Sequence, residues 1–356
     1  MISGNTTAEK TGGADQSSSH QTKIENTERV PAAVLQAQAW PAWRQWLKLP
    51  PPMVRLRTAH WWNVANRVRQ LQGIEGLAFP PGRKAGIFKG STVMWDHLAQ
   101  HSPSIDRSIY RGRTFIGGQV GRSRVTNPHG ALAVATRVAD FDFDITEIDG
   151  ICNSQSEDRV FDSVQDFGRD YVAYEQASVD AAGLEMMIRH REVRLIHSPG
   201  ADTLMLQAWD GRLFVCNGGG SHHLAGAAYI AREIGESLPL RARLSLDWLN
   251  APAWHWLIET FFILQVPQAY RGLGDIAVLT GAAYLIELPN WVSQSSLLLL
   301  PRHVPVSRDV VELHLKAGLR EVAEDIESLL SRQAAMLATL GQRFPVLCPW
   351  LGQIPR

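Results

Sequence analysis

The stretch "LFVCNGGGSHHLAGAAYIAREIG", residues 213–235, passes from an apolar run through three glycines to a helical pattern. The apolar run predicts a strand that ends just before the glycines. Ser221 is expected as the N-cap of a helix from His222 to about Ile234, with Gly235 as its C-cap. The predicted buried face of this helix comprises Leu224, Ala228, Ala231 and Ile234. A strand, a turn and a helix are therefore predicted in succession.

The glycine turn, residues 218–220, places free backbone amides at the start of this helix. Such amides and the positive end of the helix dipole attract anions, and glycine lets a ligand approach the backbone closely. We therefore expect the phosphates of a nucleotide to bind here. The dipole also favours neutral His222, which suits a general base and makes it the candidate catalytic residue. The expected nucleotide-binding residues are Asn217, Gly218, Gly219, Gly220, Ser221, His222 and His223.

Common glycine-rich motifs do not match this turn. The P-loop needs a Gly-Lys-Ser/Thr ending, and the dinucleotide fingerprint needs glycine where His223 stands. His223 also replaces the last glycine of the nucleophile elbow G-x-S-x-G. Because adjacent His222 and His223 would point in different directions, a shared metal ion is not favoured unless the turn is irregular; His197, at a predicted strand end, could lie near them. The alternative is a turn that only caps a core helix.

The corner resembles the phosphate-binding corner of the ParB and sulfiredoxin superfamily over about residues 195–235. The resemblance rests on the Asp-Gly hairpin turn at 210–211, the strand after it and "NGGGSHHLAGAA". In that superfamily a glycine-containing turn holds a nucleotide triphosphate at a helix start. The resemblance implies ATP or CTP as the ligand. It matches Gly219 and Gly220 to the turn, Ser221 to the sulfiredoxin cysteine, His222 to the histidine and His223 to the usual arginine.

Two departures from that superfamily change the expected chemistry. Serine at 221 excludes a thiol intermediate there, and Cys216 lies five residues earlier, inside the strand. A histidine at 223 replaces the bidentate phosphate contact of arginine by a weaker one. Nucleotide binding is therefore expected without sulfiredoxin chemistry.

A second candidate site lies in "ADFDFDITEIDG", residues 139–150. In a strand, Asp140, Asp142 and Asp144 would project from one face. Asp142 and Asp144 are the candidate ligands for Mg²⁺ beside a triphosphate. The EF-hand pattern fails, because its glycine and glutamate positions hold isoleucine. The alternative is an edge strand that carries charges against unwanted pairing.

Charge is balanced overall but not locally. The 356 residues contain 35 Lys and Arg against 35 Asp and Glu. From 41 to 130, fourteen basic residues face three acidic ones, whereas twelve acidic residues face three arginines from 131 to 180. The basic region could bind DNA, or the two halves could complement each other. Its tryptophans could stack on bases or anchor a core; they are Trp40, Trp43, Trp46, Trp61 and Trp62.

Composition points to a cytoplasmic protein without a membrane partner. Cys152, Cys216 and Cys348 are too few for a disulfide framework, which favours a reducing compartment. The N-terminus has no basic start and no apolar segment typical of a secretory signal. The apolar runs fall short of the roughly 20 residues that span a bilayer.

The remaining patterns predict a mixed set of elements. Helices are expected at 31–47, 60–73 and 163–190, and a long amphipathic helix at 307–341 with a kink at Gly318. This long helix leaves a homodimer and packing on its own domain open. Strands are expected at 113–120, 131–138, 141–148, 192–198, 203–209, 212–217, 241–249, 261–267, 282–289 and 295–301.

These elements predict an α+β fold, a mixed sheet with a ParB/sulfiredoxin-like core, a helical N-terminal region and a long C-terminal helix. The expected domains are a disordered tail at 1–28, a basic Trp-rich region at 29–130, the α+β core at 131–305 and a C-terminal helix and tail at 306–356. The expected function is ATP or CTP binding, with metal-dependent hydrolysis or phosphate transfer left open. The alternative is a non-catalytic module that binds DNA or protein.

Overall fold

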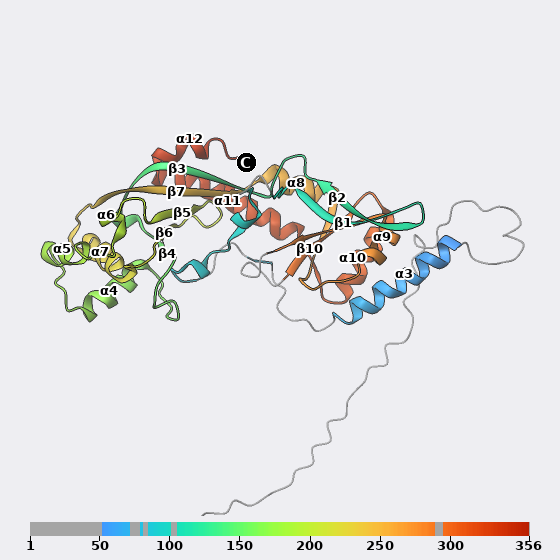
Figure 1. Ribbon diagram of the computed structural model, residues 1–356, viewed down its shortest axis with the longest axis horizontal. Coiled ribbons are helices and arrows are strands. Elements are labelled where there is room, and N and C mark those ends of the chain that lie inside the picture. The colour runs from blue at the N-terminus through green and yellow to red at the C-terminus, as the bar shows by residue number, and fades with distance from the viewer. Residues whose placement is uncertain (1–51, 72–78, 81–84, 101–104, 289–294, 356) are drawn as a thin grey trace, which may run out of the picture.

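Two β-sheets with helices packed around them form the molecule (Figure 1). The computed structural model describes residues 52–71, 79–80, 85–100, 105–288 and 295–355. The predicted tail at 1–28 and the predicted helix at 31–47, with Trp40, Trp43 and Trp46, lie outside the described residues. Helices and strands are both abundant, so the predicted α+β class is confirmed.

The first sheet has five strands in the order β3-β7-β5-β6-β4. Strand β3 (Ala133–Asp144) forms one edge and pairs antiparallel with β7 (Pro239–Leu249). Strands β5 (Thr203–Gln207) and β6 (Leu213–Cys216) form an antiparallel hairpin, as the Asp-Gly signal predicts. Strand β4 (Gly150–Ile151) runs parallel to β6, so both strands end at the same edge of the sheet.

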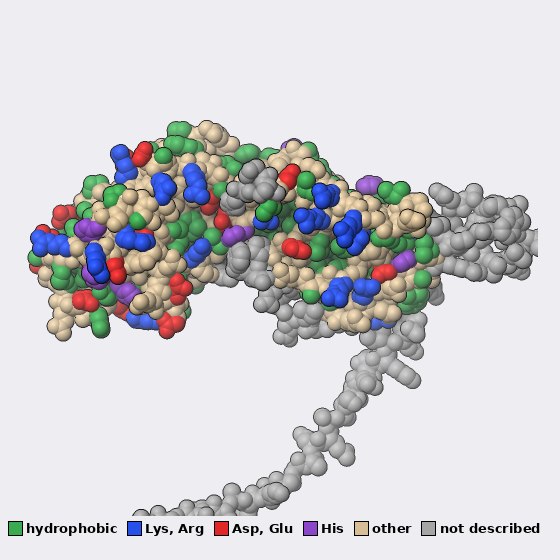
Figure 2. Space-filling view, in the orientation of Figure 1, with side chains coloured by type: hydrophobic (Ala, Val, Ile, Leu, Met, Phe, Trp, Pro, Cys, Tyr) green, Lys and Arg blue, Asp and Glu red, His purple; other side chains and the backbone are tan. Residues whose placement is uncertain are grey.

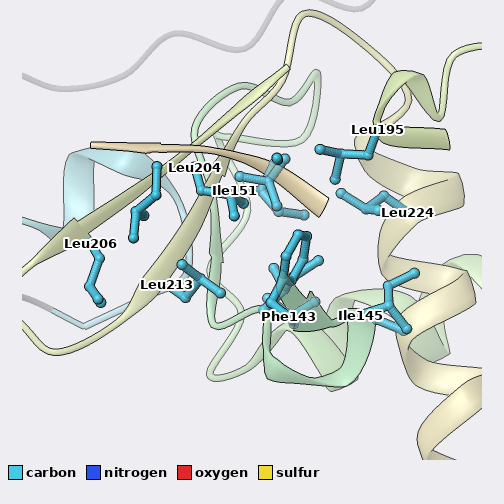
Figure 3. Packing of buried hydrophobic residues seen from close by; sticks show 14 of the residues in the cluster. Phe143, Ile145, Ile151, Leu195, Leu204, Leu206, Leu213 and Leu224 are labelled. Atoms are coloured by element: carbon cyan, nitrogen blue, oxygen red, sulfur yellow. The ribbon is translucent and has the colours of Figure 1, made fainter. Parts of the chain in front are cut away.

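Helices from the middle of the chain contribute to the core of this sheet: α4 (Val164–Tyr174), α5 (Ala181–Ile188), α6 (Arg194–His197) and α7 (Ser221–Ile234). Helix α7 contacts α4 and α5 and buries its small apolar residues against them. In Figure 3, Leu195 and Leu224 point from the helices toward Ile151 and Leu204 of the strands. The apolar periodicity of 221–234 therefore places α7 in the core, with its first turn at the sheet edge where β6 ends.

The second sheet has six strands in the order β11-β8-β10-β9-β1-β2, and neighbouring strands are antiparallel. Helices cover both faces of its centre (Figure 1). Leu298 and Leu300 contact the cluster with α3, α9 and α10, whereas Leu297 and Leu299 join the cluster with α8 and α11. This two-sided burial explains the uninterrupted apolar run "SSLLLLP". The strands are β1 (Ile109–Ile116), β2 (Gln119–Thr126), β8 (Phe261–Pro267), β9 (Ala282–Glu287), β10 (Ser295–Pro301) and β11 (Arg320–Glu321).

The helices of this half are α3 (Pro52–Arg69), α8 (Ala251–Thr260), α9 (Leu273–Thr280), α10 (Pro305–Lys316) and α11 (Ala323–Arg343). Helix α11 lies between the two sheets (Figure 1). Its Ile326 and Leu329 pack beneath the second sheet, and its Leu337 and Leu340 belong to the core of the first. Short elements complete the described chain: η1 (Lys89–Ser91), η2 (Trp95–Leu98), η3 (Ile145–Glu147), η4 (Pro345–Leu347) and α12 (Cys348–Leu351).

Several predicted elements differ in the structure. The helix predicted at 163–190 is two helices, α4 and α5, and the strands predicted at 131–138 and 141–148 form the single strand β3. The segment 192–198 contains helix α6, so the strand predicted there is wrong. The segment 113–120 is a hairpin, because Gly117 and Gly118 adopt φ angles of 60° and 87° that turn β1 into β2. The helix predicted at 307–341 is two helices separated by β11, since Gly318 at φ 89° ends the first.

Candidate functional site

A cleft of about 870 Å³ opens where β4 and β6 end and α7 begins. The glycine turn forms one side of this cleft, and the loop 153–159 lies across from it. Side chains of α4 and of the segment 190–192 complete the walls. The cleft thus lies outside the carboxyl ends of two adjacent parallel strands, a position that favours ligand binding in α/β sheets.

Each glycine of the turn occupies a different environment. Gly220 adopts φ 68°, and a Cβ there would lie 2.3 Å from the carbonyl oxygen of Glu192. A Cβ at Gly218 would lie 2.0 Å from the Arg194 guanidinium. At Gly219 the nearest neighbour, the Glu192 carboxylate, would be 3.9 Å away. Close packing against backbone and a positive φ therefore require glycine at 220, whereas Gly218 faces only the flexible end of Arg194 and Gly219 leaves open space toward the cleft.

Ser221 is the first residue of α7, so its predicted role as the N-cap is wrong. Gly220 holds the cap position, with no side-chain cap hydrogen bond. Ser221 is buried, and its hydroxyl donates to Ser154 Oγ at 3.1 Å. The predicted C-cap, Gly235, is confirmed by its φ of 67°. The Ser221 side chain thus links the helix start to the 153–159 loop instead of satisfying the helix amides.

The amides of the turn differ in how they are satisfied. Gly218 N–H donates to the buried Asp202 carboxylate at 3.1 Å, and Asp202 also pairs with Arg194. The next five amides have no hydrogen-bond acceptor within the part of the chain that the structure describes; they belong to Gly219, Gly220, Ser221, His222 and His223. The first turn of α7 therefore presents unsatisfied donors at the cleft.

Two asparagines hold the turn against the neighbouring strand. Asn153 Nδ2 donates to the Asn217 carbonyl at 2.6 Å, and Asn217 Nδ2 donates to the Asn153 carbonyl at 3.1 Å. Asn217 Nδ2 also donates to the Gly219 carbonyl at 2.9 Å. Asn217 is buried, so its predicted place at the site is structural support for the turn.

His222 contacts the loop and α4. Its Nε2 lies 2.9 Å from Ser156 Oγ, and its ring lies 5.0 Å from the rings of Phe167 and Tyr171. Burial lowers the pKa of His222 below 6.5, and the positive charge of Arg159 lowers it further. Neutral His222 can therefore accept the proton of the Ser156 hydroxyl.

His223 faces a different set of partners. Its ring stacks on His190 at 3.7 Å, and its Nε2 lies 3.2 Å from the Tyr171 hydroxyl. Burial and the neighbouring His190 lower the pKa of His223. Burial raises the pKa of Tyr171 to about 12, so this phenol stays protonated as a donor. His197 instead contacts the Ile188 carbonyl through Nε2 at 2.6 Å and does not join these histidines.

Carboxylates dominate the charged rim of the cleft. Glu157, Glu175 and Glu192 line it, and Asp170 forms a 2.6 Å ion pair with Arg159. Within the described residues, no group of three or more His, Cys, Asp or Glu side chains is arranged to hold a metal ion. An anion bound at the turn therefore relies on backbone amides, and a cation carried with it would meet the rim carboxylates.

The structure does not bring Asp142 and Asp144 to the glycine turn. Asp142 pairs with Arg241 Nε at 2.5 Å, and this hydrogen bond lowers the pKa of the carboxyl. Asp144 accepts hydrogen bonds from Thr146 and from Ser237, which follows the far end of α7. Because α7 is about 21 Å long, Asp144 lies about a helix length from the turn, and neither acid lines the cleft. The Mg²⁺ site predicted from them is not formed there, and β3 is the charged edge strand of the alternative.

Two cysteines meet beneath the cleft. The register of β4 and β6 sets Cys152 beside Cys216, and their sulfurs are 2.8 Å apart. Their hydrogen bond lowers the pKa of Cys216 and raises that of Cys152. The signal for this pairing is in the sequence: "ICN" at 151–153 and "VCN" at 215–217 end the two parallel strands. Residues missed at the sequence level include Asn153, Ser156, Tyr171, His190, Arg194 and Asp202.

The described part of the basic region does not reach the cleft. Trp61 is buried in the core cluster with α9 and α10, so it anchors α3 and is not open for base stacking, and Trp62 is half-buried. Four arginines of the region project from β1 and β2 in the second sheet. None of the described helices is both long and apolar enough to pass through a membrane.

A family model described as "Family of unknown function (DUF6685)" matches residues 138–339, more than half of the chain. This match begins within β3 and includes every wall of the cleft. No curated protein and no solved structure matches the chain.

Proposed function

The chain belongs to the family of unknown function DUF6685, and we propose that its cleft binds a nucleotide-sized ligand through phosphate on the glycine turn. The observation that carries this proposal is the run of unsatisfied amides from Gly219 to His223 at the start of a 14-residue helix. The first amides of a helix lack partners within it and are satisfied by side chains, water or a ligand, so these donors are available to a bound anion. A phosphate supplies several acceptor oxygens at once and gains from the helix dipole.

The size and lining of the cleft support a ligand larger than phosphate alone. Its 870 Å³ lies within the usual range of small-molecule sites. Tyr171 and Tyr174 line the cleft from α4, and their ring centroids are 6.2 Å apart. The face of a tyrosine ring can stack on a nucleotide base. The resemblance to ParB and sulfiredoxin proteins favours ATP or CTP. The rim carboxylates favour entry of the nucleotide as its Mg²⁺ complex, because the cation offsets their repulsion of phosphate.

Acid–base chemistry at this site would rest on His222. Its neutral imidazole lies 2.9 Å from the Ser156 hydroxyl and beside the turn that would hold the phosphate. A neutral imidazole can take a proton from this hydroxyl, or from water bound in its place, while an oxygen attacks phosphorus. This arrangement supports hydrolysis or phosphate transfer over passive binding.

Calorimetric titration of the full chain tests binding. ATP, CTP, GTP and inorganic phosphate would each be titrated with and without Mg²⁺ into the wild type and two variants. Gly219→Asp places a negative charge in the open space at the turn, and Gly219→Asn is the matched uncharged control. We expect Gly219→Asp to weaken binding about tenfold or more, as like charges repel, and Gly219→Asn to weaken it far less. If no ligand produces a heat of binding, the result would contradict the proposal and support a turn that only caps the helix.

Phosphate release tests the chemistry separately. We expect wild type to release phosphate from the bound nucleotide, and His222→Gln to lower the rate about a hundredfold. His303→Gln, at an exposed position far from the cleft, is the control purified in the same way. Binding without release in the wild type would identify a nucleotide-binding module and reject the catalytic role of His222.

A further inference from the structure

Four arginines share one face of the β1–β2 hairpin. The antiparallel register places Arg111 opposite Arg124 and Arg113 opposite Arg122. Residues directly opposite each other point to the same side of a sheet, and so do residues two apart along one strand. The four side chains, here named the arginine face, therefore form a two-by-two array about 5 Å across and about 7 Å along the strands.

Opposing charges do not neutralise the arginine face. Among the described residues, none of its four guanidinium groups has an ion-pair partner. Helix α9 packs beside β1, but its Asp275 is engaged by His60 at 2.6 Å and by Arg67 at 3.0 Å. Glu287, on the same side of the adjacent strand β9, is exposed and forms no ion pair with the array in the described structure. Like charges directly opposite each other destabilise a sheet, so this array costs folding stability.

The arginine face is open to a partner. Arg111, Arg122 and Arg124 are exposed, Arg113 is half-buried, and β2 is the edge strand of the second sheet. Figure 2 shows Lys and Arg side chains gathered over this part of the molecule. Protection of the sheet edge by charge explains arginines on β2, but β1 is paired on both sides. Arg111 and Arg113 therefore need another explanation.

We propose that the arginine face docks onto the phosphate backbone of a nucleic-acid duplex, independently of the cleft. Arginine binds phosphate through two parallel hydrogen bonds, and a rigid sheet holds four such groups in fixed spacing. Contacts of this kind position a protein on a duplex without reading its sequence. Apolar side chains on this face lie beyond the array, at the hairpin end, where Val120 is 40% exposed and its partner Phe115 is half-buried; Ile116 at 76% projects from the opposite face. The array itself thus offers charge alone, which favours a phosphate backbone over a membrane surface. Four of the basic residues in the region 41–130 thus form one defined surface.

Fluorescence anisotropy with a labelled, mixed-sequence DNA duplex tests the proposal on the full chain. We expect the affinity to fall steeply with salt, because each neutralised phosphate releases counterions. The double variant Arg122→Gln/Arg124→Gln should lower the magnitude of the slope of log K against log salt by about 2. The control Arg169→Gln/Arg189→Gln removes the same charge from exposed positions in α4 and at the C-cap of α5 and should keep the wild-type slope.

Thermal melting separates binding from a structural role. Removing two of four opposed arginines should leave the melting temperature unchanged or raise it while duplex binding weakens. Duplex RNA and vesicles rich in phosphatidylserine are parallel probes. Binding to RNA at equal strength supports a backbone contact. The proposal is overturned if wild type binds no duplex at low salt, if vesicles bind and duplexes do not, or if the two double variants behave alike.

Discussion

Asn153 and Asn217 hold each other by reciprocal hydrogen bonds, since each side-chain amide donates to the backbone carbonyl of the other, at 2.6 and 3.1 Å. They follow the parallel strands β4 and β6 at equivalent positions. The pair fixes the loop that carries Ser156 against the glycine turn that begins α7. Hydrogen bonds from side chain to backbone therefore join the two sides of the cleft, which do not depend on a ligand to meet.

Asn217→Asp should disrupt this connection without changing side-chain size. The variant replaces an NH₂ group that donates to the carbonyls of Asn153 and Gly219 with a carboxylate oxygen that repels both. We expect a loss of about 2 kcal/mol or more in the free energy of unfolding, measured by urea denaturation at pH 7. Asn66→Asp, at an exposed position of α3, is the control. Equal stability of the two variants would contradict the support role of Asn217.

Alanine should lower the stability strongly at one glycine of the turn and hardly at all at its neighbour. Gly220→Ala forces a side chain into φ 68° and sets its Cβ 2.3 Å from the Glu192 carbonyl oxygen. The left-handed conformation alone costs about 1 to 2 kcal/mol, and the overlap adds to it. Gly219→Ala meets no atom closer than 3.9 Å and should change stability by about 0.5 kcal/mol or less. Urea midpoints compare the two, and a larger loss for Gly219→Ala would contradict this geometry.

His314 should make the protein sensitive to mild acid. It is fully buried, with Nδ1 2.7 Å from the Val310 carbonyl and Nε2 2.9 Å from the Tyr270 hydroxyl. Burial lowers its pKa from 6.5 to about 4. The unfolded chain therefore binds the proton more tightly, so stability is complete above about pH 6.5 and declines as the pH falls toward 4. Between pH 7 and 5 this linkage removes about 2 kcal/mol.

Urea denaturation of His314→Gln at both pH values measures this effect. The variant should be less stable than wild type at pH 7, because it disturbs a buried hydrogen-bonded pair. The difference from wild type should shrink by about 2 kcal/mol at pH 5, since the variant lacks the titrating ring. His303→Gln, with an exposed side chain, should follow the wild type at both pH values. A constant difference between wild type and His314→Gln would contradict burial of the neutral ring.

Cys152 and Cys216 should form a disulfide when the folded protein is treated with diamide. Their sulfurs, 2.8 Å apart, need to approach by less than about 1 Å to reach bonding distance. Diamide accepts the two electrons and both thiol protons. The lowered pKa of Cys216 provides the attacking thiolate. Mass spectrometry of the non-reduced peptides should show this link, while exposed Cys348 is alkylated first. Crosslinking through Cys348 alone would contradict the register of β4 and β6.

Local signals predicted the corner of the cleft because each is contained within a few residues. The strand, the glycine turn and the Gly235 cap lie within 213–235, and all three are present in the structure. The segment 192–198 failed because Val193 and Leu195 suit one short helix turn as well as a strand. A single helix was predicted at 307–341 because the helical spacing of apolar residues continues past Gly318. In the structure the chain turns at Gly318 and enters β11.

The rest of the cleft depends on contacts between distant segments. Ser156 meets His222 across 66 positions of sequence, and Asn153 meets Asn217 across 64. The hydrophobic periodicity of a sequence carries no information about such contacts. The repeated "ICN" and "VCN" strand ends do relate two of the segments, but this signal becomes informative only once the strands are known to be parallel. The acidic residues of β3 show the same limit: their local strand was predicted correctly, but their distance from the glycine turn was not.

Helix α11 also has a thermodynamic consequence. At 21 residues it is about 31 Å long, and it contributes to the cores of both sheets. At its middle, buried Gln333 accepts from Leu249 N–H at 2.7 Å and donates to the Leu249 carbonyl at 2.9 Å, at the end of β7. If either sheet unfolded alone, the apolar residues of α11 that pack against that sheet would be exposed to water. Melting should therefore be cooperative across both sheets, as one calorimetric transition rather than two.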